Sequence, residues 1–458
     1  MWRPRDIDFD RPLYLAIADA LQRDIADGTI APGARLPTHR ELAGIVGVDV
    51  STVTRAYKES ERRGLLSGTV GRGTFVSADV GVSVPLVRGD PIDSELLEMG
   101  LVLPLYSLEE RIADALRANV ISMDIPRFLR YSDPKGIEEH RAVGAAWVNR
   151  YGLSATADDI LVTSGTQNGL SCALMALLKP GDRIAVDALT YPGLKTVASM
   201  LNIRLVSIEM DGAGMLPDAL EAACRREALR ALYLMPVFQN PTTSSLPDDR
   251  REAIAVIVER YDLILLEDDA YADTSEKRNA ALSARLPDNA LFFGGISKVF
   301  GAGLRVSFLA APARWRPSLE RAILASVWMA SPFCSAIVSG IIADGSVEAI
   351  LRSKREEARR RVSLAMKKLG ARRFLCPPSG FFGWLELPRP WTGKEFELAA
   401  AAAGVRVFCA EKFAVGKDAP AAVRLSLSGP ETFDDLSRGI DVLAKILAED
   451  RREGEGVF

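Results

Sequence analysis

The chain has 458 residues, of which 48% are hydrophobic and 26% charged, and its formal net charge is −3. This length predicts roughly two or three domains, and the composition is typical of a folded protein. The sequence has no apolar run of about 18 residues and begins without an apolar signal segment, so we expect no membrane span or secretion. Five scattered cysteines and two histidines favour neither a disulfide framework nor a metal site, which fits a reducing cytoplasm.

Two helices are predicted near the N-terminus. Apolar residues at every fourth position predict the first helix over residues 12–28, which ends at Gly28. Thr38 can cap a second helix over residues 39–46, with Glu41 as its partner in a capping box.

A third helix is expected from Asp49 or Ser51 up to Gly64, followed by two short strands around a glycine-rich turn. Three helices and a hairpin predict a winged helix-turn-helix over residues 1–78, whose third helix would enter the major groove of DNA. Guanidinium and hydroxyl groups suit phosphates and base edges. The candidate DNA contacts are Arg40, Ser51, Thr52, Arg55 and, at the tip of the hairpin, Arg72.

The segment from Pro12 to Val76 resembles the DNA-binding domain of the GntR family. The stretches APGARLPTHRELA and GRGTFV are specific in combination, and TVTRAY is typical of the MocR regulators, the subgroup fused to an aminotransferase-like domain. The resemblance implies that a double-stranded DNA operator is a partner. Val50 stands where the family often has an arginine, so the operator sequence is not predicted.

Residues 79–94 have few core-forming side chains and predict a linker. Beyond them apolar strands mostly alternate with helices, which predicts an α/β domain over 95–452 with a mostly parallel sheet covered on both faces. Residues 345–452 begin with a charged helix and predict a smaller α+β subdomain. The strands are expected at 159–163, 183–186, 204–208, 231–235, 263–267, 291–294 and 306–309.

Polar groups follow several of these strands, at the edge where open α/β sheets bind ligands. Pyridoxal phosphate needs an amine, an acid for its ring nitrogen, donors for its phosphate and a group that stacks on its ring. Each motif alone is also an ordinary turn, loop or core segment, and the set is more specific than its parts. The candidates are Ser164, Gly165, Thr166, Tyr191, Asn240, Asp268, Tyr271, Ser297, Lys298, Arg305 and Arg424. Trp328, Phe333 and Phe381 are expected to pack in the core or, alternatively, to shape the pocket.

The motifs SGTQ, TYPG, QNPT, EDDAY, SKVFGAGLR and RLSLS, in this order and spacing, resemble the fold-type I aminotransferases over about residues 95–450. The resemblance implies pyridoxal phosphate as the cofactor, Lys298 as the catalytic Schiff-base lysine and Asp268 as the partner of the pyridine nitrogen. It further implies that Asn240 and Tyr271 contact the ring oxygen.

The same resemblance implies that Tyr191 stacks on the cofactor ring and that Arg424 binds a ligand carboxylate. The phosphate would be held by Ser297, by Arg305 and by the start of the helix that follows Ser164, Gly165 and Thr166.

We expect a transcriptional regulator that senses a small amino compound, or pyridoxal phosphate itself, through aldimine formation. The resemblance implies a head-to-tail homodimer. An active aminotransferase with an appended DNA-binding domain is the alternative, so enzymatic activity stays open. A pseudo-enzyme without cofactor is disfavoured because Lys298, Asp268 and Arg305 are all present.

Overall fold

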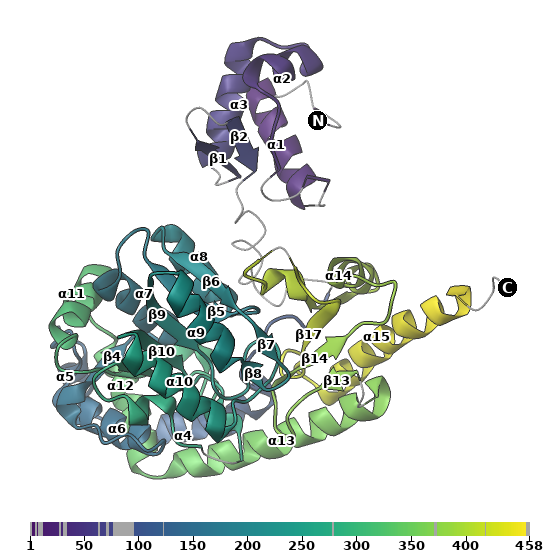
Figure 1. The fold of residues 1–458 in the computed structure, drawn as a ribbon. Helices are drawn as coiled ribbons and strands as arrows, with labels where there is room; N and C mark the ends of the chain where they lie inside the picture. The colour runs from purple at the N-terminus through teal and green to yellow at the C-terminus, as the bar shows by residue number, and fades with distance from the viewer. Residues whose placement is uncertain are drawn as a thin grey trace. The chain divides into compact units, whose positions relative to one another are not determined.

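A computed structural model describes most of the chain, which divides into two units, Met1–Gly89 and Asp90–Phe458 (Figure 1). The predicted linker and Arg72 lie outside the described residues. The described residues are 2–4, 7, 12–26, 29–30, 34–62, 65–69, 73–76, 96–121, 123–276, 279–370, 373–416 and 418–454.

The first unit has the predicted order of three helices and an antiparallel hairpin, with backbone bonds from residues 34–36 extending the hairpin. The expected capping box is present, since Thr38 accepts a bond from the Glu41 backbone and Glu41 accepts one from the Thr38 backbone. Gly47 ends the second helix with a φ of 74°, a conformation that suits glycine. The elements are α1 (Leu13–Ala26), α2 (His39–Val46), α3 (Val50–Arg62), β1 (Leu66–Thr69) and β2 (Gly73–Val76).

The second unit is built on a seven-stranded sheet of order β4-β12-β11-β10-β9-β5-β6. All seven predicted strands occur in this sheet, and β12 runs antiparallel to both of its neighbours while the other pairs are parallel. The carboxyl ends of β4, β5, β9, β10 and β11 therefore share one edge. The strands are β4 (Ile160–Thr163), β5 (Arg183–Asp187), β6 (Arg204–Ile208), β9 (Leu229–Leu234), β10 (Ile264–Asp268), β11 (Ala290–Gly295) and β12 (Ser307–Ala310).

Helices cover both faces of this sheet, as the unbroken apolar strands predicted. Alternate strand residues enter different cores: Leu266 packs in one hydrophobic cluster with α7, α8 and α11, and Leu265 in another with α9 and α10. The helices α6 and α12 cover the rest of the second face. The helices are α4 (Glu109–Ile121), α5 (Ile125–Phe128), α6 (Glu138–Asn149), α7 (Thr166–Leu177), α8 (Pro192–Met200), α9 (Pro217–Arg226), α10 (Asp248–Arg260), α11 (Arg316–Val327) and α12 (Pro332–Ala343).

A smaller α+β part follows, with a four-stranded sheet of order β13-β14-β17-β16. The short strand β3 (Leu97–Glu98), from the start of the unit, pairs in parallel with β15 of this part, so two distant segments of the sequence meet there. A further hairpin joins β7 (Met210–Asp211) to β8 (Gly214–Met215). The remaining elements are α13 (Ser346–Leu369), β13 (Phe374–Leu375), β14 (Phe382–Glu386), α14 (Gly393–Ala402), β15 (Val405–Arg406), β16 (Phe408–Cys409), β17 (Ala422–Ser426) and α15 (Phe433–Gly454).

The expectation for three aromatic residues is only partly correct. Phe381 is 1% exposed and lies in the core, and Phe333 packs partly buried against a cluster. Trp328, however, is 56% exposed, so the prediction of core packing is wrong for it. It directly follows α11 at a φ of 67°, which turns the chain at the surface. Among the described residues no single helix can span a membrane by length and apolarity, although α12 and α13, bent by 85°, pass that test as a pair.

Candidate functional site

The exposed face of α3 carries three polar side chains that can meet DNA. Ser51, Arg55 and Lys58 are exposed, while Val53 and Tyr57 point into the core of the first unit. Positions four and seven residues apart share one side of a helix, so the three polar groups form one stripe. The Tyr57 hydroxyl donates to the backbone carbonyl of Pro37 at 2.8 Å, which helps to fix the orientation of this stripe.

The other predicted DNA contacts have different surroundings. Arg40 is exposed on α2 and Thr52 is half-buried on α3, while Arg72 cannot be placed because it lies outside the described residues. Lys58 is a further candidate contact that the sequence analysis did not name. Its spacing of three residues from Arg55 on the same helix was the signal that could have found it.

Asp268 ends the central strand β10 and is 3% exposed. One of its carboxylate oxygens accepts a bond from the Tyr233 hydroxyl at 2.9 Å and the other accepts from the Ala270 backbone at 3.2 Å. Burial raises the pKa of Asp268 to about 6, and the two hydrogen bonds and nearby Lys298 counteract this rise. A buried carboxylate of this kind suits a cationic nitrogen as its partner.

Lys298 lies in the turn after β11 and is half-buried. The amine donates to the backbone carbonyl of Val102. Desolvation, followed by the positive charges of Arg424 and Arg305, lowers the pKa of Lys298 to about 8. A lowered pKa makes more of the neutral, nucleophilic amine available near neutral pH.

The start of α7 forms a close approach with Arg305. Gly165 caps the helix at a φ of 82°, and a Cβ atom there would lie 2.5 Å from the Arg305 guanidinium. Arg305 also donates to the Ser164 carbonyl at 3.2 Å. At Gly295 a Cβ atom would lie 2.6 Å from the Thr166 hydroxyl, which is 3.4 Å from the Ser307 hydroxyl. Helix N–H groups, hydroxyls and a guanidinium together suit a phosphate.

Two tyrosines border the same site. Tyr191 is partly buried beside Gly193, and burial, then Asp268, raises its pKa to about 12 against the effects of Arg424 and Arg305. Tyr271 is 5% exposed, and the Lys298 amine lies 5.8 Å from the centre of its ring. Both rings are therefore within electrostatic reach of the predicted cofactor residues.

Arg424 of β17 lies 4% exposed and joins the two parts of the unit. Its guanidinium donates to the Asn240 side chain at 2.6 Å and to the Gly100 carbonyl at 2.6 Å, and its Nε has no hydrogen-bond partner among the described residues. Burial lowers the pKa of Arg424 to about 10. The rings that surround it are Phe382, Phe408 and Phe413, with the guanidinium 5.7, 5.5 and 4.8 Å from their centres.

Ser297 directly precedes Lys298 and is half-buried, so the chain alone brings these two residues together. Several residues that shape the site escaped the sequence analysis. Tyr233 is a core position of β9, and Asp187 ends β5 with a pKa that burial raises to about 7. Their positions on neighbouring strands could have identified them from the sequence. The contacts made by the segment around Val102 left no such signal.

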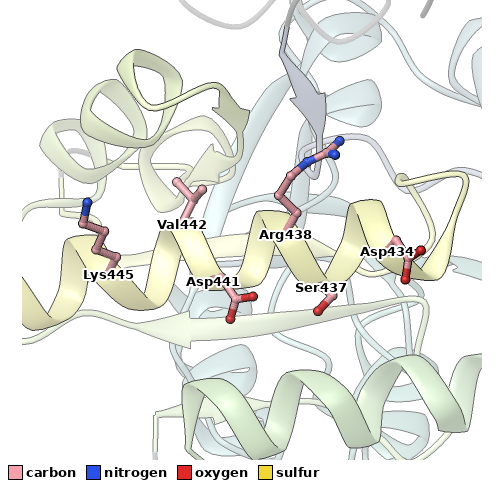
Figure 2. A pocket seen from close by; sticks show the side chains of 6 residues that line it. All are labelled: Asp434, Ser437, Arg438, Asp441, Val442 and Lys445. Atoms are coloured by element: carbon pink, nitrogen blue, oxygen red, sulfur yellow. The ribbon is translucent and has the colours of Figure 1, made fainter.

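A separate hollow of about 390 Å³ lies along α15. Figure 2 shows that its side chains leave the helix in different directions, with Arg438, Val442 and Lys445 on one side and Ser437 and Asp441 on the other. They do not converge on a common point and include none of the predicted site residues. We therefore assign the site to the sheet edge rather than to this hollow.

Comparison with known proteins supports the predicted fold of each unit. The family model of the bacterial regulatory proteins of the gntR family matches residues 13–76, and that of aminotransferase class I and II matches residues 104–440. The uncharacterized HTH-type transcriptional regulator YdeF of Bacillus subtilis is 36% identical, over 97% of this chain and 96% of that protein. The HTH-type pyridoxine biosynthesis transcriptional regulator PdxR of Corynebacterium glutamicum is 28% identical over 65% of each chain.

The fold of the second unit is similar to that of a solved aminotransferase. Kynurenine aminotransferase of Pyrococcus horikoshii has a TM-score of 0.72 at 23% identity, over 80% of this chain and 95% of that chain. Membership of aminotransferase class I and II implies pyridoxal phosphate as the cofactor. The chain therefore belongs to the MocR-type transcriptional regulators, in which a GntR helix-turn-helix domain is joined to an aminotransferase class I and II domain.

Proposed function

We propose that this regulator binds a small amino compound through pyridoxal phosphate at the sheet edge, and that this binding changes its affinity for DNA. One observation carries the proposal: the Lys298 amine, whose pKa is lowered to about 8, lies within electrostatic reach of Asp268, Arg305 and Arg424. An amine, an acid and two cations in this arrangement can bind a phosphate, a ring nitrogen and a carboxylate at once.

The residues at this edge fit pyridoxal phosphate. Because Gly165 has no side chain, the guanidinium of Arg305 can lie close to the start of α7. A cation at this position suits the phosphate. Asp268 is a buried carboxylate with two hydrogen bonds, which suits a protonated ring nitrogen. When bound, pyridoxal phosphate supplies an aldehyde that condenses with primary amines and a ring that withdraws electrons.

The protein side chains then have separate tasks. Lys298 would supply the amine and could accept a proton, because its lowered pKa keeps part of it neutral. Tyr191 would stack on the ring, and Asn240 with Tyr271 would hold the ring oxygen. Arg424 would bind a ligand carboxylate, since it is cationic and its Nε has no partner in the described part of the chain.

Absorbance and DNA affinity, measured together on the cofactor-loaded protein, test the proposal. We expect one amino compound from a panel to shift the visible band of the bound cofactor and to change operator affinity about 5–150-fold, the usual range of coupling between two sites. Loss of the band with release of an oxo acid would indicate an active aminotransferase instead. A band shift without a change in DNA affinity would contradict the regulatory role.

Replacing Arg55 tests the DNA face. We expect Arg55→Ala to weaken DNA binding by about 1–3 kcal/mol if the guanidinium reads a base, with reduced discrimination against altered operators. A phosphate contact would instead lower affinity for all sequences and reduce the salt dependence. Arg204→Ala is a matched control, because this exposed arginine lies on β6 of the other unit. Equal binding by the two variants would contradict the assignment.

We also propose a head-to-tail homodimer, and an exposed apolar patch supports self-association. Leu129 is 74% and Tyr131 82% exposed, and the Tyr131 ring lies 5.7 Å from that of Trp328, which is 56% exposed. Adjacent exposed apolar side chains of this size commonly mark an interface. We expect Trp328→Asp to shift the sedimentation of the protein toward monomer, whereas Leu398→Asp, at a residue 55% exposed on α14, leaves it unchanged. An unchanged dimer in both variants would place the interface elsewhere.

A further inference from the structure

We propose that Lys354 of α13 is a positioning residue that holds the backbone of Lys298 in place for its reaction with the cofactor. The Lys354 amine donates to the backbone carbonyl of Lys298 at 3.0 Å. This inference rests on the proposed role of Lys298, and none of the sequence motifs pointed to Lys354.

The position of Lys354 is unusual for a lysine. The residue is 2% exposed, although burying an ammonium group is costly unless a partner compensates. Burial, followed by the charge of Lys298, lowers the pKa of Lys354 to about 7, while Glu109 acts in the opposite direction. The protein therefore tolerates a second amine next to the cofactor lysine, and the bond to the Lys298 carbonyl gives it a specific task there.

The helix that carries Lys354 is itself fixed on both sides. Arg355 donates two bonds, of 3.1 and 2.7 Å, to the carbonyl of Asp273, shortly after Tyr271. Arg361 is 1% exposed and donates to the carbonyls of Leu427 and Pro430, just beyond the strand of Arg424. Figure 1 shows α13 running along both parts of this unit. Lys354 thus ties Lys298 to a helix that is held at both ends of the site.

Lys298 is consequently restrained at two points. Its amine donates to the Val102 carbonyl and its own carbonyl accepts from Lys354. The turn that carries Lys298 follows the strand β11 and precedes the segment of Arg305, so a shift of the turn would move the amine relative to the phosphate site. A displacement of about 1 Å in a reacting group can cost about 10²-fold in rate.

Two substitutions separate this positioning role from simple filling of space. Lys354→Met keeps a long unbranched chain but removes the donor, and Lys354→Gln keeps an N–H donor but removes the charge. Lys368→Met is the matched control, because Lys368 lies on the same helix and bonds Ser437 and Asp441 instead. Lys298→Ala tests separately whether Lys298 is the residue to which the cofactor attaches.

The measurements are the dissociation constant for added pyridoxal phosphate, the rate at which the absorbance of the covalently bound cofactor appears, and the melting temperature without cofactor. That reaction joins the Lys298 nitrogen to the aldehyde carbon and releases water. We expect Lys354→Met to slow it about 10- to 100-fold, by analogy with misplaced reacting groups. Lys354→Gln should stay within about threefold of wild type because it restores a donor, and Lys368→Met should match wild type.

Covalent attachment of the cofactor to Lys354→Met at the wild-type rate would overturn the inference. Equal slowing of this attachment in the Met and Gln variants would also overturn it. A lower melting temperature, with an unchanged rate of covalent attachment in the folded fraction, would likewise show that Lys354 is merely structural. Covalent capture by Lys298→Ala would overturn the assigned role of Lys298, and the role of Lys354 with it. If Lys298→Ala shows no covalent attachment, as expected, the role of Lys298 stands and the Lys354 variants alone decide the inference.

Discussion

Lys298→Ala is expected to abolish covalent attachment of the cofactor and with it the visible band that this attachment produces. The variant has no amine at the point where desolvation, Arg424 and Arg305 lower the lysine pKa to about 8. Proton transfer by Lys298 would be lost as well, which should slow any reaction of a bound amino compound by about 10²–10⁴-fold. Absorbance of the purified variant before and after adding pyridoxal phosphate measures the first effect.

Lys298→Arg is the control for charge, because it keeps a cation but has no amine that can condense with an aldehyde. We expect it to behave like Lys298→Ala in the absorbance measurement. DNA binding by both variants in the absence of ligand should be retained, since the first unit has a separate core formed by residues such as Leu21, Leu42 and Tyr57. A wild-type band in either variant would contradict the assignment of Lys298.

The fold was predictable from the sequence because burial leaves a simple pattern. Both faces of the large sheet are covered, so the strands β4, β9, β10 and β11 are nearly continuous apolar runs bounded by turns. Thr38 and Glu41 likewise form a local capping signal three residues apart. In these cases the residues that cause a strand or a helix start to form lie within a few positions of one another in the sequence.

The contacts that complete the site were not predictable in the same way. Arg424 bonds Gly100 across 324 positions and Lys298 bonds Val102 across 196 positions, both through backbone carbonyls that carry no mark in the sequence. The parallel pairing of β3 with β15 brings that segment to the site, and two-residue strands have no recognisable period. Core packing was expected for Trp328 because large apolar residues are usually buried, and the proposed self-association would be a competing reason for its exposure.

Asp268→Asn is the second substitution with a large expected effect. Asp268 is buried at the end of β10, and its carboxylate would pair with the protonated ring nitrogen of the cofactor. Removing one member of a buried ion pair typically costs about 3–5 kcal/mol, so we expect cofactor affinity and the rate of reaction with amines to fall by roughly 10²–10⁴-fold. Equilibrium binding of pyridoxal phosphate measures the first effect, and the rate of the absorbance change measures the second.

Tyr233→Phe distinguishes a lost charge from a lost hydrogen bond. The Tyr233 hydroxyl lowers the pKa of Asp268 by donating to it, whereas the Ala270 backbone donates to the other oxygen and is unaffected by this change. The carboxylate would remain, but its pKa would rise above about 6, so cofactor affinity should weaken at acidic pH and recover as the pH rises. Asp268→Asn has no group to ionise and should show no such recovery. A pH-dependent recovery in both variants would mean that another group pairs with the ring nitrogen.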